Sequence, residues 1–394
     1  MISALLPALA GMSLLSAAAA PREVTIPFEL VNKTVFMRVT VNARPLWFVL
    51  DTGIKPAVVD LAVAKSIGLE LGDPAAVVGA GKDTVTARFL KSGRVSIVGL
   101  EGFSQPLVIA LPLEKLANAS GHEFAGLLGT DFIRGFVIAI DYTRHTLTLH
   151  DTSGFAYHGG GEALPISFNA SGHPLVVAEV IDSGRPPMRG QFVADIGSGA
   201  GLILNSPFVE SGGFLTPGRP TVHWIEGRGV GGEISGVVGR VTGLRLGRTL
   251  IDHPITVFTR VSTGPFASVD AQGDIGAAIF EKFTVILDYS RMRIILEPNA
   301  RFPEPLEYNR SGFSLGSSGP DYKTFRVDTV AENSPAAEAG LQAGDTLVAI
   351  DGRPADTYTL SEIRLMLKDA RQCRLTVQRG ASRLALTLRL RSAI

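Results

Sequence analysis

Short runs in which apolar and polar residues alternate occupy much of the chain up to residue 300, with turn residues between them. Residues 24–42 (VTIPFELVNKTVFMRVTVN) and 174–194 (PLVVAEVIDSGRPPMRGQFVA) show this pattern. Because successive side chains of a strand point to opposite faces, alternation with a period of two predicts half-buried β-strands. The 44 glycines and 23 prolines are spread out, which favours many turns over disorder. We therefore expect an all-β fold here.

Two of the apolar runs end in the same motif, Phe-Val-x-Asp-x-Gly. They are WFVLDTGIKPAV (47–58) and QFVADIGSGAGL (191–202), whose acids Asp51 and Asp195 are 144 residues apart. Farther on, GLLGTDFIRGFVIAIDYTRHTLTL (126–149) aligns with GDIGAAIFEKFTVILDYSRMRIIL (273–296) at an offset of 147 residues. An ordered series of matches at nearly one offset indicates two copies of a unit of about 145 residues.

Each unit also contains a glycine-bearing hairpin, at residues 77–90 and 226–241. Glycine-rich hairpins between β-branched runs can act as mobile flaps, although ordinary surface hairpins explain either one equally well. As flaps, the segments near 79–88 and 227–238 would close over a substrate. Their glycines are Gly79, Gly81, Gly229 and Gly231.

The pattern changes after a proline-bearing linker at residues 301–310. Residues 333–354 (NSPAAEAGLQAGDTLVAIDGRP) predict a short helix, a glycine turn and a strand. The segment 359–370 places Leu360, Ile363 and Leu367 at helical spacing, which predicts an amphipathic helix. Two alternating runs, CRLTVQRG and RLALTLRL, then predict a final pair of strands. We expect residues 311–394 to form a separate small domain of strands plus two helices.

Length and charge narrow the class of protein. A chain of 394 residues is expected to hold two to three domains. The 37 basic and 37 acidic residues balance, so no electrostatic footprint for nucleic acid is present. Cys373 is the single cysteine, which excludes an intrachain disulfide. The seven histidines occur singly without metal-ligand spacing, so we expect no metal and no cofactor.

The first 20 residues, MISALLPALAGMSLLSAAAA, are apolar and end in small residues. They predict a secretory signal peptide cleaved near the end of the alanine run, although the usual basic beginning is missing. The expected location is therefore exported, periplasmic or secreted. An N-terminal membrane anchor is the less favoured alternative, because Pro7 and Gly11 interrupt the apolar run.

The paired acids suggest a chemistry. Aspartates on equivalent loops of two copies packed face to face would meet across a pseudo-two-fold axis. Two carboxyl groups so close cannot both ionise, and they share one proton. The ionised carboxylate can take a proton from water while the protonated one hydrogen-bonds a peptide carbonyl, so hydrolysis needs no metal or covalent intermediate.

These residues resemble the aspartic proteases. Asp51-Thr52-Gly53 after Phe48-Val49-Leu50 is similar to their active-site motif, and GLLGTDF and GDIGAAIF resemble their second hallmark. The resemblance covers about residues 22–300 and is closer to the retropepsin-like branch than to pepsin. It implies that Asp51 and Asp195 are the catalytic pair. It also implies that neighbouring residues shape their loops, namely Thr52, Gly53, Gly197 and Ser198.

Ile196 departs from the family pattern. In the family, the Thr or Ser hydroxyl at this position hydrogen-bonds across to the opposite loop, and an isoleucine cannot do this. On the favoured interpretation, Ile196 only contributes packing, Thr52 alone hydrogen-bonds the backbone, and catalytic activity survives. On the other interpretation, the second copy has drifted and the protein binds peptides without cutting them. We also expect the Ser198 hydroxyl to favour the ionised form of Asp195, which makes Asp195 the base and leaves the shared proton on Asp51.

The C-terminal segment resembles a bacterial PDZ domain of the type attached to proteases, through NSPAAEAGLQAGDTLVAIDG. The resemblance implies that the SGFSLG loop captures a peptide C-terminus and that the peptide adds a strand beside the helix at 359–370. A purely structural cap is the alternative. The predicted carboxylate-binding loop comprises Gly312, Phe313, Ser314 and Leu315.

The combined prediction is an exported aspartic endopeptidase with a polypeptide substrate and a peptide C-terminus as partners. Its expected parts are a signal peptide (1–20), lobe 1 (21–155), lobe 2 (156–300), a linker (301–310) and a PDZ domain (311–394). A catalytically inactive peptide-binding scaffold is the competing class. We expect a monomer, because both acids come from one chain; a dimer that uses the first copy twice is less favoured.

Overall fold

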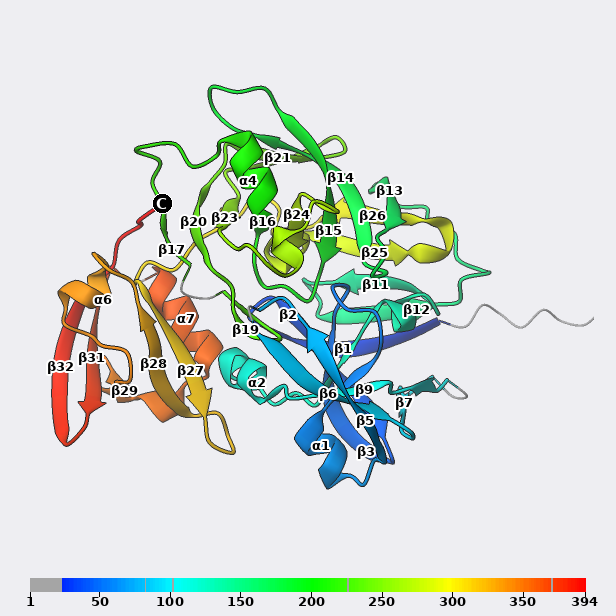
Figure 1. Cartoon of the computed structure of the whole chain (residues 1–394), viewed down its shortest axis with the longest axis horizontal. Helices are drawn as coiled ribbons and strands as arrows, with labels where there is room; N and C mark the ends of the chain where they lie inside the picture. The colour runs from blue at the N-terminus through cyan, green and yellow to red at the C-terminus, as the bar shows by residue number, and fades with distance from the viewer. Residues whose placement is uncertain (1–22, 82, 101–102, 225–226, 370) are drawn as a thin grey trace, which may run out of the picture.

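The computed structural model describes residues 23–81, 83–100, 103–224, 227–369 and 371–394 (Figure 1). The predicted signal peptide lies outside these residues. Strands dominate throughout, and all of the helices are short, as expected from the alternating pattern. Within the described ranges, no helix has the length and apolar character needed to cross a membrane.

A six-stranded antiparallel sheet joins the two lobes. Its order is β1–β12–β11–β25–β26–β13, so each half contributes three strands. At its centre, Ala139 lies opposite Ile286, its own equivalent 147 residues later, so a pseudo-two-fold axis passes through this pair. The strands are β1 (Glu23–Val31), β11 (Val137–Asp141), β12 (Thr146–His150), β13 (Glu162–Phe168), β25 (Phe283–Asp288) and β26 (Arg293–Pro298).

Lobe 1 is built around two parallel pairs of strands. β3, which ends at Leu50, pairs in parallel with β10, and β4 pairs in parallel with β9. β10 also pairs antiparallel with β4, which locks the two pairs together. The elements are β2 (Thr34–Val41), β3 (Arg44–Leu50), β4 (Val58–Asp60), α1 (Leu61–Ser66), β5 (Leu71–Val78), β6 (Thr84–Leu90), β7 (Arg94–Ser96), β8 (Gln105–Pro106), β9 (Ile109–Leu111), α2 (Glu114–Ser120), β10 (Gly126–Leu128) and α3 (Thr130–Ile133).

Lobe 2 repeats this arrangement of pairings. β15, which ends at Asp195, pairs in parallel with β24, β16 pairs in parallel with β23, and β24 pairs antiparallel with β16. Each acid therefore lies at the end of a central buried strand. The elements are β14 (Pro174–Ile181), β15 (Met188–Asp195), β16 (Leu202–Leu204), α4 (Ser206–Gly212), β17 (Val222–His223), β18 (Arg228–Gly229), β19 (Gly232–Glu233), β20 (Gly236–Arg240), β21 (Gly243–Leu246), β22 (Thr249–Asp252), β23 (Ile255–Thr259), η1 (Pro265–Ala267), β24 (Gly273–Gly276), α5 (Ala277–Phe280) and η2 (Tyr289–Arg291).

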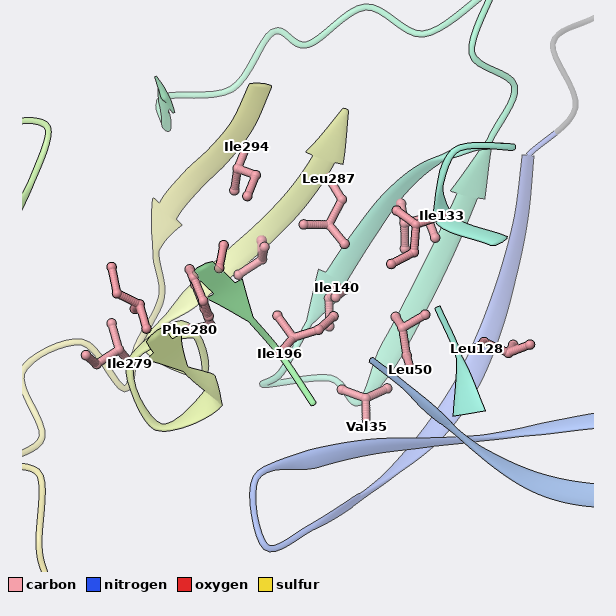
Figure 2. Packing of buried hydrophobic residues seen from close by; sticks show 14 of the residues in the cluster. Val35, Leu50, Leu128, Ile133, Ile140, Ile196, Ile279, Phe280, Leu287 and Ile294 are labelled. Carbon is pink, nitrogen blue, oxygen red and sulfur yellow. The ribbon is translucent and has the colours of Figure 1, made fainter. Parts of the chain in front are cut away.

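One apolar core runs through both lobes. It contains Leu50, Ile140, Ile196 and Leu287, which come from both lobes and are drawn together in Figure 2. Burial of side chains of this size is the main favourable contribution to folding, so the lobes are expected to fold as one unit. The predicted lobe boundary between residues 155 and 156 falls in the connection between β12 and β13.

The C-terminal domain has a separate core that includes Phe325, Ile363 and Leu375. Its sheet runs β27–β28–β29–β31–β32, with β30 beside β29. The predicted amphipathic helix is α7, which begins with a capping box between Thr359 and Glu362; residue 370 lies outside the description. The elements are β27 (Phe313–Ser318), β28 (Thr324–Val330), α6 (Pro335–Glu338), β29 (Thr346–Ile350), β30 (Arg353–Pro354), η3 (Ala355–Thr357), α7 (Leu360–Asp369), β31 (Gln372–Arg379) and β32 (Ser382–Arg389).

Candidate active site

The two acid loops meet where the lobes join. The Gly53 N–H donates to Asp51 Oδ1 at 2.8 Å, and the Gly197 N–H donates to Asp195 Oδ1 at 2.9 Å. A Cβ atom on Gly53 would lie 2.8 Å from Asp195 Oδ2, and one on Gly197 would overlap the Asp51 carboxyl group. Each glycine therefore abuts the acid of the opposite loop, and the absence of side chains there allows the two carboxyl groups to approach.

Thr52 fastens the loops together. Its hydroxyl donates to the Ala194 carbonyl at 2.5 Å and accepts from the Ile196 N–H at 2.9 Å. The Thr52 side chain is completely buried, so neither hydrogen bond competes with water. Bonds of this kind span both loops and fix the position of one acid relative to the other.

Ile196 occupies the equivalent position in the second loop and packs instead. Only 1% of its surface is exposed, and it lies in the core shared by the lobes, with Leu50 and Ile140 (Figure 2). The structural part of the favoured interpretation matches this arrangement, in which Ile196 packs and Thr52 bonds the opposite backbone. One hydroxyl forms the link between the loops.

The acids differ in how easily they ionise. Burial, followed by repulsion from Asp195, raises the pKa of Asp51 to about 8. Burial also raises the pKa of Asp195, but hydrogen bonds from the N–H groups of Gly197 and Ser198 act against that rise. The ionised form is thus better stabilised on Asp195, and the shared proton belongs on Asp51.

The contribution of Ser198 comes from its backbone. Its N–H donates to Asp195 Oδ1 at 3.2 Å, while its hydroxyl oxygen accepts from the Ala200 N–H at 3.4 Å. The assignment of acid and base stays a prediction, but the Ser198 hydroxyl is not its cause, because the turn after Asp195 supplies the donor from the main chain. Any residue that keeps this turn can supply it.

The glycines of the second hallmark support the loops from below. Gly129 and Gly276 are the N-caps of α3 and α5. A Cβ atom on Gly129 would lie 2.5 Å from the carbonyl oxygen of Ile54, and one on Gly276 would overlap the carbonyl oxygen of Ala200. These two positions must be glycine because the acid loops rest directly on them.

Asp274, which precedes Gly276 by two residues, was not among the candidate residues predicted from the sequence. Alignment of GLLG with GDIG places Asp274 where the first copy has Leu127, so the signal was present in the repeat itself. Burial, then the negative charges of Asp195 and Asp51, raise the pKa of Asp274 well above its usual range. A third carboxyl group thus lies within the electrostatic field of the pair.

The two predicted flaps touch each other. The tip between β5 and β6 meets the tip between β18 and β19, where the Gly81 N–H donates to the Val230 carbonyl at 2.8 Å and the Asp83 N–H donates to the Gly231 carbonyl at 2.9 Å. A Cβ atom added to Gly79 would lie 2.6 Å from the Cβ atom of Val230. A Cβ atom added to Gly229 would lie 2.7 Å from the Cβ atom of Ala80. All four predicted glycines are thus at the contact, and residue 82 lies outside the description.

The predicted carboxylate loop of the C-terminal domain is internally hydrogen-bonded. The N–H groups of Ser311 and Gly312 donate to Asn309 Oδ1 at 2.9 and 3.1 Å. Phe313, Ser314 and Leu315 begin β27, which pairs with β28. A peptide carboxylate would need to displace the Asn309 side chain to reach the N–H groups of Ser311 and Gly312. Capture of a peptide C-terminus by this loop stays a prediction.

Lobe 1 contacts β27 and α7, the elements beside which a bound peptide was expected. The Ser317 hydroxyl donates to the Asn118 carbonyl at 2.8 Å, and Arg364 on α7 donates to the carbonyls of Ala119 at 2.9 Å and Leu315 at 3.1 Å. Figure 1 shows α2, which contains Asn118 and Ala119, beside β27 and α7. In this arrangement, a helix of lobe 1 lies against both elements that were predicted to flank the peptide strand.

A family model described as "Aspartyl protease" matches residues 37–132, and one described as "PDZ domain" matches residues 326–379. The chain therefore carries an aspartyl protease domain followed by a C-terminal PDZ domain. The first match contains the Asp51 loop and the hallmark glycine Gly129. No curated protein matches the sequence.

Proposed function

We propose that the chain is an aspartic endopeptidase whose catalytic pair is Asp51 and Asp195. The observation that carries this proposal is the contact between the two acid loops, in which each loop glycine abuts the opposite carboxyl group. The joined hairpin tips support it further, since they would enclose a polypeptide that binds between the hairpins and the acids. The side chains of both aspartates are half-buried rather than sealed, which suits groups that must reach a substrate.

In the proposed reaction, Asp195 acts as the general base and Asp51 as the general acid. The Asp195 carboxylate takes a proton from a water molecule as the water oxygen attacks the carbonyl carbon of the scissile peptide bond. The Asp51 carboxyl hydrogen-bonds the carbonyl oxygen and gives it a proton, which yields a neutral tetrahedral diol. Asp195 then protonates the amine nitrogen, the C–N bond breaks, and a hydroxyl proton returns to Asp51.

The test compares the parent chain with Asp51→Asn and Asp195→Asn on a diverse peptide mixture read by mass spectrometry. Each substitution keeps the shape of the side chain but removes the acid–base function, so cleavage should fall by about 1,000-fold or more in both. Matched control variants are Asp252→Asn and Asp270→Asn, which neutralise exposed acids of lobe 2. Circular dichroism of every variant checks that the fold is retained.

Each pattern of results supports or rejects one class. Loss in both dyad variants and in neither control supports a single intramolecular pair. Loss in Asp51→Asn alone would indicate a dimer of first lobes, which the mass of the chain in solution would also reveal. Absence of cleavage by the parent from pH 3 to 9 would favour a peptide-binding scaffold.

For the C-terminal domain, we propose peptide capture that requires release of α2. The contacts of Ser317 and Arg364 with lobe 1 lie at both elements predicted to flank the peptide, so a free peptide must compete with the chain's own segment. Arg364→Ala should therefore tighten the binding of C-terminal peptides several-fold in a fluorescence-anisotropy titration, while Leu365→Ala, at an exposed position of the same helix, should not. Weaker binding in Arg364→Ala would instead make this arginine part of the peptide site.

Export follows in this proposal from residues 1–20 acting as a signal peptide, with the periplasm or the exterior as the place of action. The working form is expected to be a monomer, since one chain supplies both acids. Sequencing of the mature N-terminus and light scattering of the purified chain test these two points.

A further inference from the structure

Asp274 lies on the same side of the lobe 2 sheet as the catalytic pair. β24 pairs in parallel with β15, so that Gly276 faces Asp195 and Asp274 faces Val193. Residues two apart in a strand point to the same face of the sheet, so Val193 and Asp195 share a face. Asp274, the partner of Val193, lies on this same face, two residues before the level of Asp195. The Asp274 side chain is half-buried.

The same face leads toward the hairpins. On its other edge, β24 pairs with β16, where Asp274 is opposite Ile203. Ile203 belongs to an apolar cluster with Ile234 of the second hairpin and with Ala80 at the tip of the first. Asp274 is therefore placed between the acid loops and the hairpin tips, which is the space assigned to the substrate.

Lobe 1 has an apolar residue at the equivalent position. Leu127 on β10 pairs with Val49 on β3 and with Val58 on β4, just as Asp274 pairs with Val193 and Ile203. The apolar cluster around Leu127 also includes residues of the hairpins, among them Val77, Val85 and Val230. The two halves of the cleft thus present the same backbone, with an apolar group on one side and an acid on the other.

Within the part of the chain that the structure describes, the Asp274 carboxyl group has neither a hydrogen-bond donor nor a cation as a partner. Those same residues contain no cluster of three His, Cys, Asp or Glu side chains that could hold a metal ion. A carboxyl group in such a place is costly unless it gains a partner, because burial and the neighbouring acids oppose its ionisation. A cationic side chain of a bound substrate would supply such a partner.

We propose that Asp274 is a specificity-determining residue that binds a cationic side chain, lysine or arginine, of the polypeptide beside the bond to be cut. The proposal rests on the proposed peptidase function of the site and names its class of substrate: peptides with a basic residue on the lobe 2 side and an apolar residue on the lobe 1 side. A positive charge beside Asp274 neutralises its carboxylate, which has no counterpart in lobe 1. It also gives that carboxylate the charge-assisted hydrogen bonds that the protein does not supply.

The experiment measures kcat/KM for a set of peptides that differ at one residue, with lysine, arginine, norleucine or glutamate at each of the three positions on either side of the cleaved bond. The parent, Asp274→Asn and Asp274→Leu are compared, and Asp270→Asn is the matched control because it removes a nearby exposed charge. The ratio for lysine against norleucine is taken within each variant, so that a general change in activity cancels. At one position, the parent should prefer lysine by about 10- to 100-fold.

In Asp274→Asn this preference should fall to about two-fold, and in Asp274→Leu it should reverse toward norleucine, because an apolar side chain now meets an apolar wall. Asp270→Asn should behave as the parent. A parent that cleaves peptides without preferring a basic residue at any position overturns the proposal. So does a preference that persists in both Asp274 variants.

A binding measurement separates this proposal from the proposed catalysis. Two uncleavable peptide analogues with a hydroxyethylene group in place of the scissile bond, one with lysine and one with norleucine, are titrated calorimetrically into the parent and into Asp274→Asn. Tighter binding of the lysine analogue that is lost in Asp274→Asn supports the inference even if no peptide is cleaved. Equal affinities for the two analogues reject it even if the enzyme is active.

Discussion

The two acid loops have the same backbone, but the hydroxyl that bonds the backbone of the opposite loop comes from the first loop. In the first loop, Thr52 donates to the carbonyl of Ala194 and accepts from the N–H of Ile196. In the second loop, Ile196 contributes packing in the shared core. A hydroxyl can donate and accept at once, so one threonine satisfies two buried backbone groups of the opposite loop. A symmetric backbone therefore does not require a symmetric set of hydrogen bonds.

The strands that carry the hallmark glycines show a second difference between the lobes. Leu127 continues an apolar surface, whereas Asp274 interrupts the equivalent surface with an acid. A homodimeric site would present two identical walls. Two lobes in one chain can differ, and they therefore have the means to distinguish the two sides of a peptide.

The largest effect is expected when the hydroxyl of the first loop is removed. Thr52→Val leaves the buried N–H of Ile196 and the carbonyl of Ala194 without a partner, which should lower the free energy of unfolding by about 2–4 kcal/mol. The variant should also lose most of its activity. Ile196→Val, the matched change in the second loop, removes one methylene group and should cost about 1 kcal/mol.

Urea titrations followed by tryptophan fluorescence measure both variants in the relevant part of the molecule. The two tryptophans, Trp47 and Trp224, both lie in the protease lobes, so the signal does not report unfolding of the C-terminal domain. Equal losses of stability in Thr52→Val and Ile196→Val would contradict the asymmetric linkage.

The next effect concerns the ionisation of the two acids. Because the pKa of Asp51 is raised to about 8, the general acid is protonated below that pH and is lost above it. On a peptide without ionisable side chains, kcat/KM should fall about ten-fold per pH unit above pH 8. The acidic limit should lie above the usual aspartate range, since the pKa of Asp195 is also raised. A pH–rate profile from pH 3 to 10 measures both limits.

The pH dependence of the free energy of unfolding provides a control, because the direction of its change follows from the raised pKa. A carboxyl whose pKa is raised by folding contributes stability that is fully present below its unfolded pKa and is lost as the pH rises through its folded pKa. The parent should therefore lose stability relative to Asp51→Asn between about pH 4 and pH 8. A difference between the two that does not change with pH would show that Asp51 is not the group that holds the proton.

The smallest effect is expected at Ser198. Its backbone N–H bonds Asp195, while its hydroxyl bonds Ala200, so Ser198→Ala retains the donor that stabilises the carboxylate. The acidic limit of the pH–rate profile should then move by less than about 0.3 unit. A larger shift toward higher pH would show that the hydroxyl itself stabilises ionised Asp195 during the reaction.

Most of the fold could be predicted because its signals are local or repeated. Alternation predicted the strands, the 147-residue offset predicted two equivalent lobes, and helical spacing predicted α7. The two glycine-bearing hairpins were predicted from residues such as Gly81 and Gly231, but the contact between their tips was not. The contact of α2 with the C-terminal domain was not predicted either, since nothing in either segment specifies the other as its partner.

The order of amino acids supplies the residues of this site: two aspartates after apolar strands, one threonine, and glycines where chains must approach. Tertiary structure alone decided how they act. In the proposed reaction, burial and electrostatic repulsion, which exist only when the lobes pack together, make Asp51 the holder of the proton and Asp195 the base. The same packing brings Asp274 onto their face of the sheet. A charge has no defined partner along the chain, and its role is fixed only by what surrounds it in three dimensions.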